Sequence, residues 1–269
     1  MGLMKILHCL RAPVGGLFRH VLDLALEQAK RGHEVGILAD SNAEDRLTAQ
    51  KFAAAAPFLK LGIIRTPISR APGLGDLSAI RAVAAHAKRL DVDVLHGHGA
   101  KGGLYARLAA LRLYRRGVRS FYTPHGGSLH STPGSLAARV YMAVERGLEP
   151  LTDGVIFESA YAAEIYRARV GGRMAACRVI HNGVRDDDFE PVRCGADAAD
   201  IIFVGELRDL KGVDVPIDAI AELKAERPIR ASIVGSGPDA DTLKARAVAR
   251  GVDHLVVFTG ALPSRDALT

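Results

Sequence analysis

The sequence predicts an α/β fold made of two Rossmann-like domains, of which the second is incomplete. Short apolar runs rich in β-branched residues alternate with amphipathic segments of about 10 to 16 residues, which is typical of βαβ units and a parallel sheet. The charge is also divided: residues 1–185 contain 26 Lys and Arg against 14 Asp and Glu, whereas residues 186–269 contain 10 against 16. This difference indicates two domains with different tasks, and the basic one favours an anionic surface or a phosphorylated substrate. Ordinary solvated helix faces explain the same charges equally well.

The predicted N-terminal domain, residues 1–185, has seven strands separated by helices. The strands are predicted at Lys5–Leu10, Glu34–Ala39, Leu61–Thr66, Val92–His96, Arg119–Thr123, Gly154–Phe157 and Arg178–His181. The clearest helices are predicted at Gly16–Arg31, Leu77–Leu90, Gly102–Leu113 and Ser135–Leu148. The first helix is expected to stop at Gly32, because glycine adopts the positive φ of a C′ position at little cost.

Residues 186–199 form the predicted linker, since they combine Gly and Pro with three consecutive acids. The second domain, residues 200–269, follows with strands at Ile201–Val204, Ala231–Val234 and Leu255–Phe258 and helices at Gly212–Glu226 and Asp239–Arg250. Sheets of this kind usually have about five or six strands. Three strands leave an unpaired edge and an uncovered apolar face, so we expect either a fragment of a longer protein or a naturally short chain.

The composition argues against several classes of protein. No stretch reaches the roughly 18 to 20 uninterrupted apolar residues that a membrane helix needs. The N-terminus has no long apolar run, so no signal peptide is predicted. Cys9, Cys177 and Cys194 are scattered and fit neither a disulfide framework nor a zinc site, which favours a reducing, cytoplasmic setting.

A pair of glycines follows the first predicted strand. Gly15 and Gly16 open directly into a helix, whose first N–H groups and dipole favour an anion such as a diphosphate. The spacing is neither GxGxxG nor that of a P-loop, so the dehydrogenase and NTPase interpretations lose support. A tight turn explains the same pair of glycines.

Histidines gather after two neighbouring strands of the predicted sheet. His96 and His98 lie at the end of one strand, and His125 follows the next one, at the edge where open α/β sheets bind ligands. We interpret His98 and His125 as polar contacts for a substrate and His96 as a packed core residue. No carboxylate or cysteine accompanies them at ligand spacing, so no metal is expected.

The second domain has its own candidate anion site. Gly205 ends a strand, and Arg208 and Lys211 come at the predicted start of a helix, where cations and N–H groups suit a leaving diphosphate. Gly235 and Gly237 put a flexible turn after the next strand, beside the expected nucleotide. A plain βα turn explains these last two glycines as well.

Seven segments occur in the order, and with the spacing, of one enzyme family. They are GGLFRH (15–20), DVLHGHGAKGG (93–103), YTPHGG (122–127), VIHNGV (179–184), FVGELRDLKG (203–212), IVGSGP (233–238) and VVFTG (256–260). Together they resemble the retaining GT-B glycosyltransferases of family 4, over almost the whole chain. The resemblance implies a GT-B-like fold and transfer of a sugar from a nucleotide-diphosphate donor to a hydroxyl acceptor, in cell-surface polysaccharide or glycolipid synthesis.

The resemblance also implies roles for individual residues. Gly15 and Gly16 are expected to approach the donor diphosphate, and Lys211 to hold it. His125 is expected to contact the transferred sugar, His98 to lie on the acceptor side, and His20 to lie near the acceptor side or to brace the glycine loop. The sugar nucleotide is a substrate, and no cofactor or metal is implied, because side chains and helix ends stabilise the diphosphate.

Two features depart from the family pattern. Glu206 stands where the family often has Arg, and we hypothesise that Arg208 supplies the guanidinium instead. The family's Glu-x7-Glu segment, which holds the donor sugar and ribose, is not found in either domain and is expected beyond residue 269.

The sequence does not specify the acceptor, the sugar, the base of the nucleotide, the linkage or the oligomeric state. Residues 107–119 interleave basic and apolar residues, which suits either a helix lying on an anionic membrane, as a lipid-linked acceptor would require, or a solvated helix covering the sheet. The first interpretation places the protein peripherally at the inner face of the membrane. Nucleic acid is not an expected partner, because the basic residues lack interleaved aromatic residues and any known binding motif.

Other functions remain open. A sugar-nucleotide epimerase on the same scaffold would use the donor without an acceptor. A truncated, non-catalytic homologue would act as a binding or partner subunit.

Overall fold

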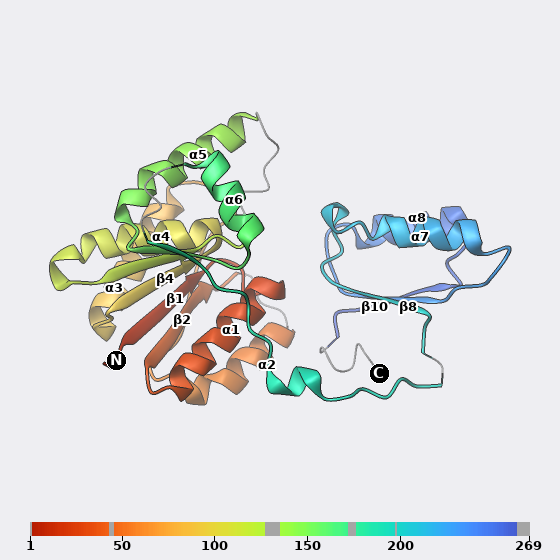
Figure 1. Cartoon of the computed structure of the whole chain (residues 1–269), viewed down its shortest axis with the longest axis horizontal. Coiled ribbons are helices and arrows are strands. Elements are labelled where there is room, and N and C mark those ends of the chain that lie inside the picture. Colours follow the sequence, from red (N-terminus) through yellow and green to blue (C-terminus); the bar gives the residue numbers. More distant parts are fainter. Residues whose placement is uncertain (1, 43–45, 127–134, 172–175, 197, 263–269) are drawn as a thin grey trace. The chain divides into compact units, whose positions relative to one another are not determined.

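The computed structural model describes residues 2–42, 46–126, 135–171, 176–196 and 198–262. The chain divides into two compact units, Met1–Arg185 and Asp186–Thr269 (Figure 1). Each unit contains its own parallel sheet, so the predicted α/β, Rossmann-like fold class is confirmed. Within the described residues, no helix is both long and apolar enough to cross a membrane.

Unit 1 is built on a seven-stranded sheet in the order β3-β2-β1-β4-β5-β6-β7, with every neighbouring pair parallel. The strands are β1 (Lys5–Leu10), β2 (Glu34–Asp40), β3 (Gly62–Thr66), β4 (Val94–His98), β5 (Arg119–Thr123), β6 (Gly154–Phe157) and β7 (Cys177–Val179). The order reverses between β1 and β4, which is the switch point where ligands of such sheets bind.

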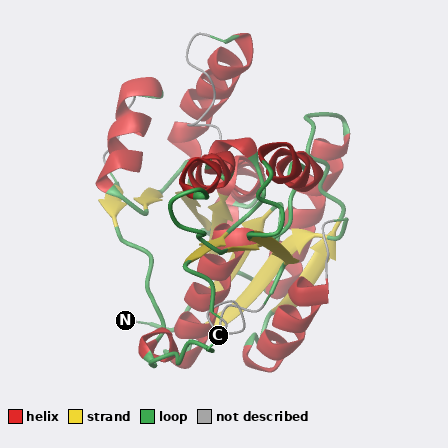
Figure 2. Ribbon diagram, turned by 90° about the vertical axis from the view of Figure 1, so that its right-hand side faces the viewer, coloured by secondary structure: helices red, strands yellow, loops and turns green. Residues whose placement is uncertain are grey.

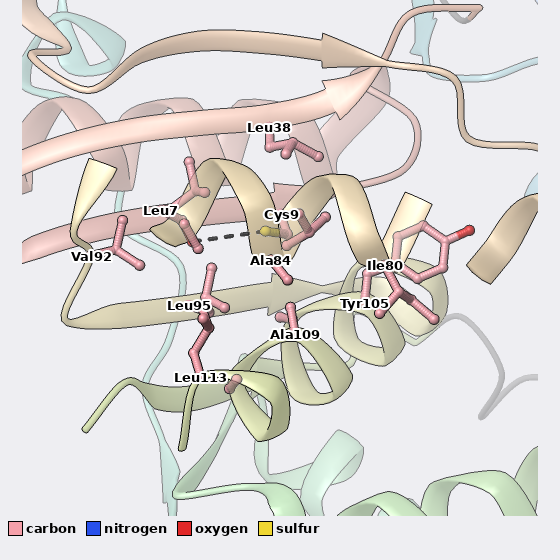
Figure 3. Close-up of a cluster of buried hydrophobic side chains, with 14 of the residues drawn as sticks. Leu7, Cys9, Leu38, Ile80, Ala84, Val92, Leu95, Tyr105, Ala109 and Leu113 are labelled. Atoms are coloured by element: carbon pink, nitrogen blue, oxygen red, sulfur yellow. Dashed lines mark hydrogen bonds between the residues drawn. The ribbon is translucent and has the colours of Figure 1, made fainter. Parts of the chain in front are cut away.

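Helices cover both faces of this sheet (Figure 2). They are α1 (Gly15–Lys30), α2 (Arg46–Ala55), α3 (Gly75–Leu90), α4 (Gly99–Arg112), α5 (Leu136–Leu148) and α6 (Ala160–Arg169). Successive strand residues alternate between the faces. Leu7 and Cys9 of β1 pack with Leu95 of β4 against α3 and α4 (Figure 3), whereas Leu10 packs against α1.

Several predicted boundaries were wrong. The strand predicted at Val92–His96 is β4, which begins at Val94 and continues through His98, and α4 begins directly afterwards rather than at Gly102. The last strand of unit 1 ends at Val179 rather than His181. No bounds were predicted for helices α2 and α6. Gly32 does have the expected positive φ, 92°, at the end of α1.

Three glycines around α4 are there for packing. A Cβ on Gly97 would come within 2.5 Å of the Cα of Gly103, and one on Gly102 or Gly103 would overlap the backbone of Cys9 or the ring of Tyr122. The small residues therefore let α4 lie unusually close to β1, β4 and β5. This packing accounts for three of the four glycines of the HGHGAKGG segment, Gly97, Gly102 and Gly103, without any ligand.

Unit 2 has three parallel strands in the order β10-β9-β8 and two helices. The elements are β8 (Ile201–Val204), α7 (Asp214–Leu223), β9 (Ala231–Val234), α8 (Ala240–Arg250) and β10 (Val256–Gly260). Its core lies on one face, where Ile217 and Leu243 of the helices meet Ile233. On the other face the side chains of Ile202, Val204 and Val257 are 44%, 57% and 59% exposed.

Candidate active site

Five histidines come together at the carboxyl edge of the unit 1 sheet. His8 lies on β1 beside His96 of β4, and His98 is two residues further along β4, on the same face. His20 comes from α1, which covers that face, and His125 follows β5. The rings form a continuous cluster with centre-to-centre distances of 4.0 to 6.0 Å between neighbours.

Hydrogen bonds link three of the rings in a chain from the interior to the edge. Gln28 Oε1 of α1 lies 2.8 Å from His8 Nε2, and His8 Nδ1 lies 2.9 Å from His98 Nε2. His98 Nδ1 then lies 3.1 Å from His125 Nε2. His96 turns to β5 instead, with its Nε2 2.9 Å from Thr123 Oγ1, which confirms it as a packed core residue.

The cluster is uncharged at neutral pH. Burial lowers the pKa of His8 and of His125 to about 4, and it holds the pKa of His96 and His98 well below 6.5. Burial also lowers the pKa of His20, although Glu158 and Asp23 oppose the shift. Neutral imidazoles offer hydrogen bonds and lone pairs to a ligand, but no positive charge.

His125 occupies an unusual backbone conformation. Its φ is +52°, in the left-handed region that β-carbon-bearing residues seldom adopt, and Gly126 follows with φ +76°. Such a conformation costs about 1–3 kcal/mol and persists where the surroundings enforce it, often at functional sites. The second glycine of this turn, Gly127, lies outside the described residues.

The predicted glycine loop opens α1 beside the histidines. Gly15 has φ +65°, which favours glycine, and a Cβ on Gly16 would meet no atom within 4 Å. The Pro13 carbonyl before them accepts a hydrogen bond from buried Thr48, which anchors the loop. In the described chain the N-cap of α1 makes no side-chain hydrogen bond, and the first turn carries no acid. The helix therefore presents free N–H groups and its positive dipole end to an anion.

The candidate residues of unit 2 sit on turns at the carboxyl ends of β8 and β9. Arg208 and Lys211 were predicted at the start of a helix from Gly212, but this was wrong. Arg208 precedes a short 3-10 turn, Asp209–Lys211, of which Lys211 is the last residue and which Gly212 ends with φ +64°. The helix starts at Asp214. Lys211 is exposed, and no ion-pair partner for it is found among the described residues. Arg208 is engaged, since its Nη2 lies 2.8 Å from a carboxylate oxygen of Glu206.

The remaining glycines of unit 2 hold the two turns together. A Cβ on Gly235 would overlap the carbonyl of Gly205, and one on Gly237 would overlap that of Leu207. The turns are also joined by a backbone hydrogen bond of 3.0 Å from Leu207 N to Ser236 O. Close backbone packing therefore requires these glycines, whatever ligand approaches them.

Residues 107–119 are not brought to the site. Arg107 is fully buried, with Nη1 2.9 Å from Glu145 Oε2 and its guanidinium 4.0 Å from the centre of the Tyr122 ring. It therefore takes no part in a basic surface, contrary to one of our interpretations. The exposed residues Arg115 and Arg116 follow the far end of α4, about 20 Å along the helix from its histidine end.

Sequence reasoning missed His8 and Gln28. His8 occupies the same face of its strand as His96 and His98, so pairing the two strands by their alternation would have revealed it. Gln28 had no comparable signal, because its contact depends on how α1 rotates over the sheet.

Two family models match the chain. Residues 14–188 match the model described as Glycosyltransferase Family 4, and residues 184–269 match Glycosyl transferases group 1. Among curated proteins, "Putative glycosyltransferase EpsD" of Bacillus subtilis (strain 168) is 31% identical over 212 residues, covering 72% of this chain. The chain spans about half, 55%, of the length of that relative.

Solved structures share the fold. The Anabaena protein Alr3699/HepE, crystallised with UDP and glucose, matches with a TM-score of 0.75 at 18% identity, over 96% of this chain and 70% of that one. WaaG, a glycosyltransferase involved in lipopolysaccharide biosynthesis, matches with a TM-score of 0.69 at 17% identity, over 98% and 72%. At these identities the likeness establishes a shared architecture, which is that of GT-B glycosyltransferases.

Proposed function

This chain belongs to Glycosyltransferase Family 4, and on that premise we propose that it serves an enzyme moving a sugar from a nucleotide-diphosphate donor to a hydroxyl acceptor, with retention. The observation that carries the proposal is the free N-terminus of α1 beside the neutral histidine cluster at the switch point of the sheet. An anion and a polyhydroxyl group are what these two neighbouring surfaces suit. The UDP and glucose in the HepE crystal support a donor of the same class.

Each predicted residue has a place in this reaction. The amides of Gly15 and Gly16 bind the diphosphate, and the exposed ammonium of Lys211 neutralises the charge that develops as it leaves. His125, held in its left-handed turn, exchanges hydrogen bonds with hydroxyls of the transferred sugar. His20 and His98 serve the acceptor side. Side chains and helix N–H groups supply the electrostatic stabilisation, so the transfer needs no metal.

Arg208 has a conditional role in the proposal. Glu206 holds its guanidinium in the ligand-free chain, so Arg208 reaches the diphosphate only by giving up that ion pair. Gly205, Gly235 and Gly237 shape the turns that border the nucleotide.

The acceptor in this proposal is a glycan or lipid-linked glycan, used for cell-surface polysaccharide or glycolipid synthesis. Exposed Arg115 and Arg116 provide a peripheral contact with an anionic membrane at the inner face. Flotation with anionic and neutral liposomes tests this part alone. Recovery that is equal with both, or unchanged by Arg115→Glu, discards the membrane contact and leaves the transferase proposal standing.

Donor binding is the primary test. We expect calorimetry on the 269-residue chain to detect UDP, GDP or ADP, or one of their hexose conjugates, and Lys211→Ala to weaken that binding. Lys244→Ala, which removes an exposed cation of the same unit on α8, is the matched control. Absence of heat with every nucleotide favours the non-catalytic partner, and conversion of a donor incubated without acceptor favours the epimerase.

A further inference from the structure

Three histidines at the sheet edge lie close enough to share one metal ion. Each of His20, His98 and His125 offers a ring nitrogen, and these nitrogens all lie within 4.8 Å of one another. Imidazole is a preferred ligand of zinc and of copper, nickel and iron. We propose that His20, His98 and His125 form a binding site for a divalent transition-metal ion of the zinc type.

The spacing of the rings fits a single ion. Imidazoles bound to a tetrahedral ion at about 2.0–2.1 Å place their ring centres about 5 Å apart and their ligating nitrogens about 3.3 Å apart. The ring centres of His20 and His125 are 5.1 Å apart, and those of His98 and His125 are 5.3 Å apart. His98 Nδ1 and His125 Nε2 lie 3.1 Å apart. Binding the ion thus replaces one hydrogen bond and needs only a small approach of His20, whose ring centre is 6.0 Å from that of His98.

The residues behind His98 supply the support that metal-binding histidines usually have. A ligating imidazole donates its other N–H to a neighbour, which fixes its tautomer and orientation. His98 Nε2 faces His8 Nδ1 at 2.9 Å, and His8 Nε2 faces Gln28 Oε1 at 2.8 Å. When the amide oxygen of Gln28 accepts from His8, His8 accepts from His98. His98 Nδ1 is then left as a lone pair directed at the site.

A second group, His8, His96 and His98, also has ring nitrogens within 4.8 Å of one another, but it is the poorer site. All three of its rings are buried, both nitrogens of His8 are hydrogen-bonded, and His96 is bonded to Thr123. His20 and His125 are only partly buried, which gives an ion a route in, and no hydrogen bond of the His20 ring is found in the described chain. The outer group also leaves a fourth position free for water or another ligand.

The metal site goes beyond the proposed function and fails separately from it. The site shares His20, His98 and His125 with the proposed transfer, in which they contact the sugar and the acceptor. Metal binding is measured without any sugar nucleotide, whereas nucleotide binding is tested at Lys211, which is not a ligand of the ion. Failure of metal binding and failure of nucleotide binding are therefore observed separately.

The test titrates the 269-residue chain, first freed of metal with a chelator and dialysed, with Co²⁺ and then Zn²⁺. We expect one ion per chain, the visible absorption of tetrahedral cobalt, and its displacement by Zn²⁺. His20→Ala and His125→Asn should each weaken binding by more than the roughly 10- to 100-fold typical of a lost supporting residue, and Gln28→Leu by about that amount. Asn is used at residue 125 because it tolerates positive φ.

His86→Ala and His254→Ala are the matched controls, since both side chains lie outside the cluster, His254 exposed and His86 half-buried. Both should bind as the unchanged chain does, and circular dichroism should show that all variants are folded. X-ray absorption of the zinc complex of the unchanged chain, expected to show three imidazole nitrogens, needs no variant. The proposal is overturned if no ion binds or if the zinc complex has a number of imidazole ligands other than three. It is also overturned if His20→Ala and His125→Asn bind normally while His96→Asn does not.

Discussion

Unit 1 and unit 2 position their polar groups in opposite ways. In unit 1 three histidines, His8, His96 and His98, are buried in a seven-stranded sheet covered on both faces, and burial keeps them neutral. In unit 2 the cations sit on turns of a three-stranded sheet covered on one face, where Arg208 is paired with Glu206 and Lys211 is exposed. The first site is therefore preorganised by the core, whereas the second depends on what it binds.

Lowering the pH should produce the largest difference in stability between the two units. The pKa of buried His8 is about 4 in the folded chain and about 6.5 when unfolded. As the pH falls from about 6.5 to 4, the unfolded chain takes up a proton that the folded chain does not, so the free energy of unfolding of unit 1 decreases. His96 shifts in the same direction. The groups that face His8 are Gln28, His20, His96 and His98.

Hydrogen exchange followed by mass spectrometry, with a chelator present, measures this acid destabilisation of unit 1. Peptides of β1 and β4 should lose protection between pH 6.5 and 4, ahead of those of β8 and β9. His8→Asn removes one titrating group and should move the midpoint of the β1 loss to lower pH. Equal protection of both units across this range would contradict the expectation.

The next largest effect concerns the charged pairs of the two units. Glu145→Ala leaves Arg107 charged in the interior, and breaking a buried pair in this way costs about 3–5 kcal/mol. Asp218→Ala in unit 2 breaks exposed pairs with Arg246 and Arg250, which should cost far less. Denaturant unfolding of both variants measures the difference, and comparable losses would show that burial does not distinguish the pairs.

Substitutions at two glycines of unit 1 distinguish a role in packing from a role in ligand binding. Gly97→Ala should destabilise the unit by about 1–3 kcal/mol, because the new Cβ lies 2.5 Å from backbone atoms of Gly102 and Gly103. Gly16→Ala meets no atom within 4 Å and should leave the melting temperature unchanged or slightly higher. Under the proposed function Gly16→Ala should still weaken nucleotide binding, as calorimetry would show. A melting temperature equally lowered by both would place Gly16 in the packing instead.

The smallest expected effects concern the charged residues of the candidate diphosphate site in unit 2. Lys211→Ala should weaken diphosphate binding about tenfold, the scale of one charged hydrogen bond, whereas Arg208→Ala should matter less because Glu206 already engages Arg208. Glu206→Gln should release Arg208 and tighten binding. Calorimetry with UDP compares the three variants. Weaker binding by Glu206→Gln would remove Arg208 from the diphosphate site.

The sequence allowed the fold class and most strands to be predicted, because buried parallel strands are short apolar runs with sharp ends. Strands β1, β5, β6, β8 and β9 begin and end where predicted. No bounds were predicted for helix α2, because its alanine-rich sequence has a weak apolar stripe. The 3-10 turn before α7 was missed because a glycine in the left-handed region leaves no pattern in its neighbours.

The site was predicted only in outline. The sequence placed His98 and His125 at one sheet edge, since carboxyl ends of parallel strands meet there. The hydrogen-bonded chain through His8 depends on strand register and helix rotation, which a single sequence specifies weakly. The engagement of Arg208 by Glu206 depends on side-chain conformation and was likewise out of reach. The donor-binding roles remain predictions.

The neighbouring positions of β1 and β4 have a kinetic consequence. His8 and His98 are hydrogen-bonded although 90 residues separate them, so the chain must close a long loop before the two rings meet. Loop closure of this kind is entropically costly and slows the formation of nonlocal strand pairs. Side-chain signals of these histidines would therefore report when, during refolding, the central strand pair has formed.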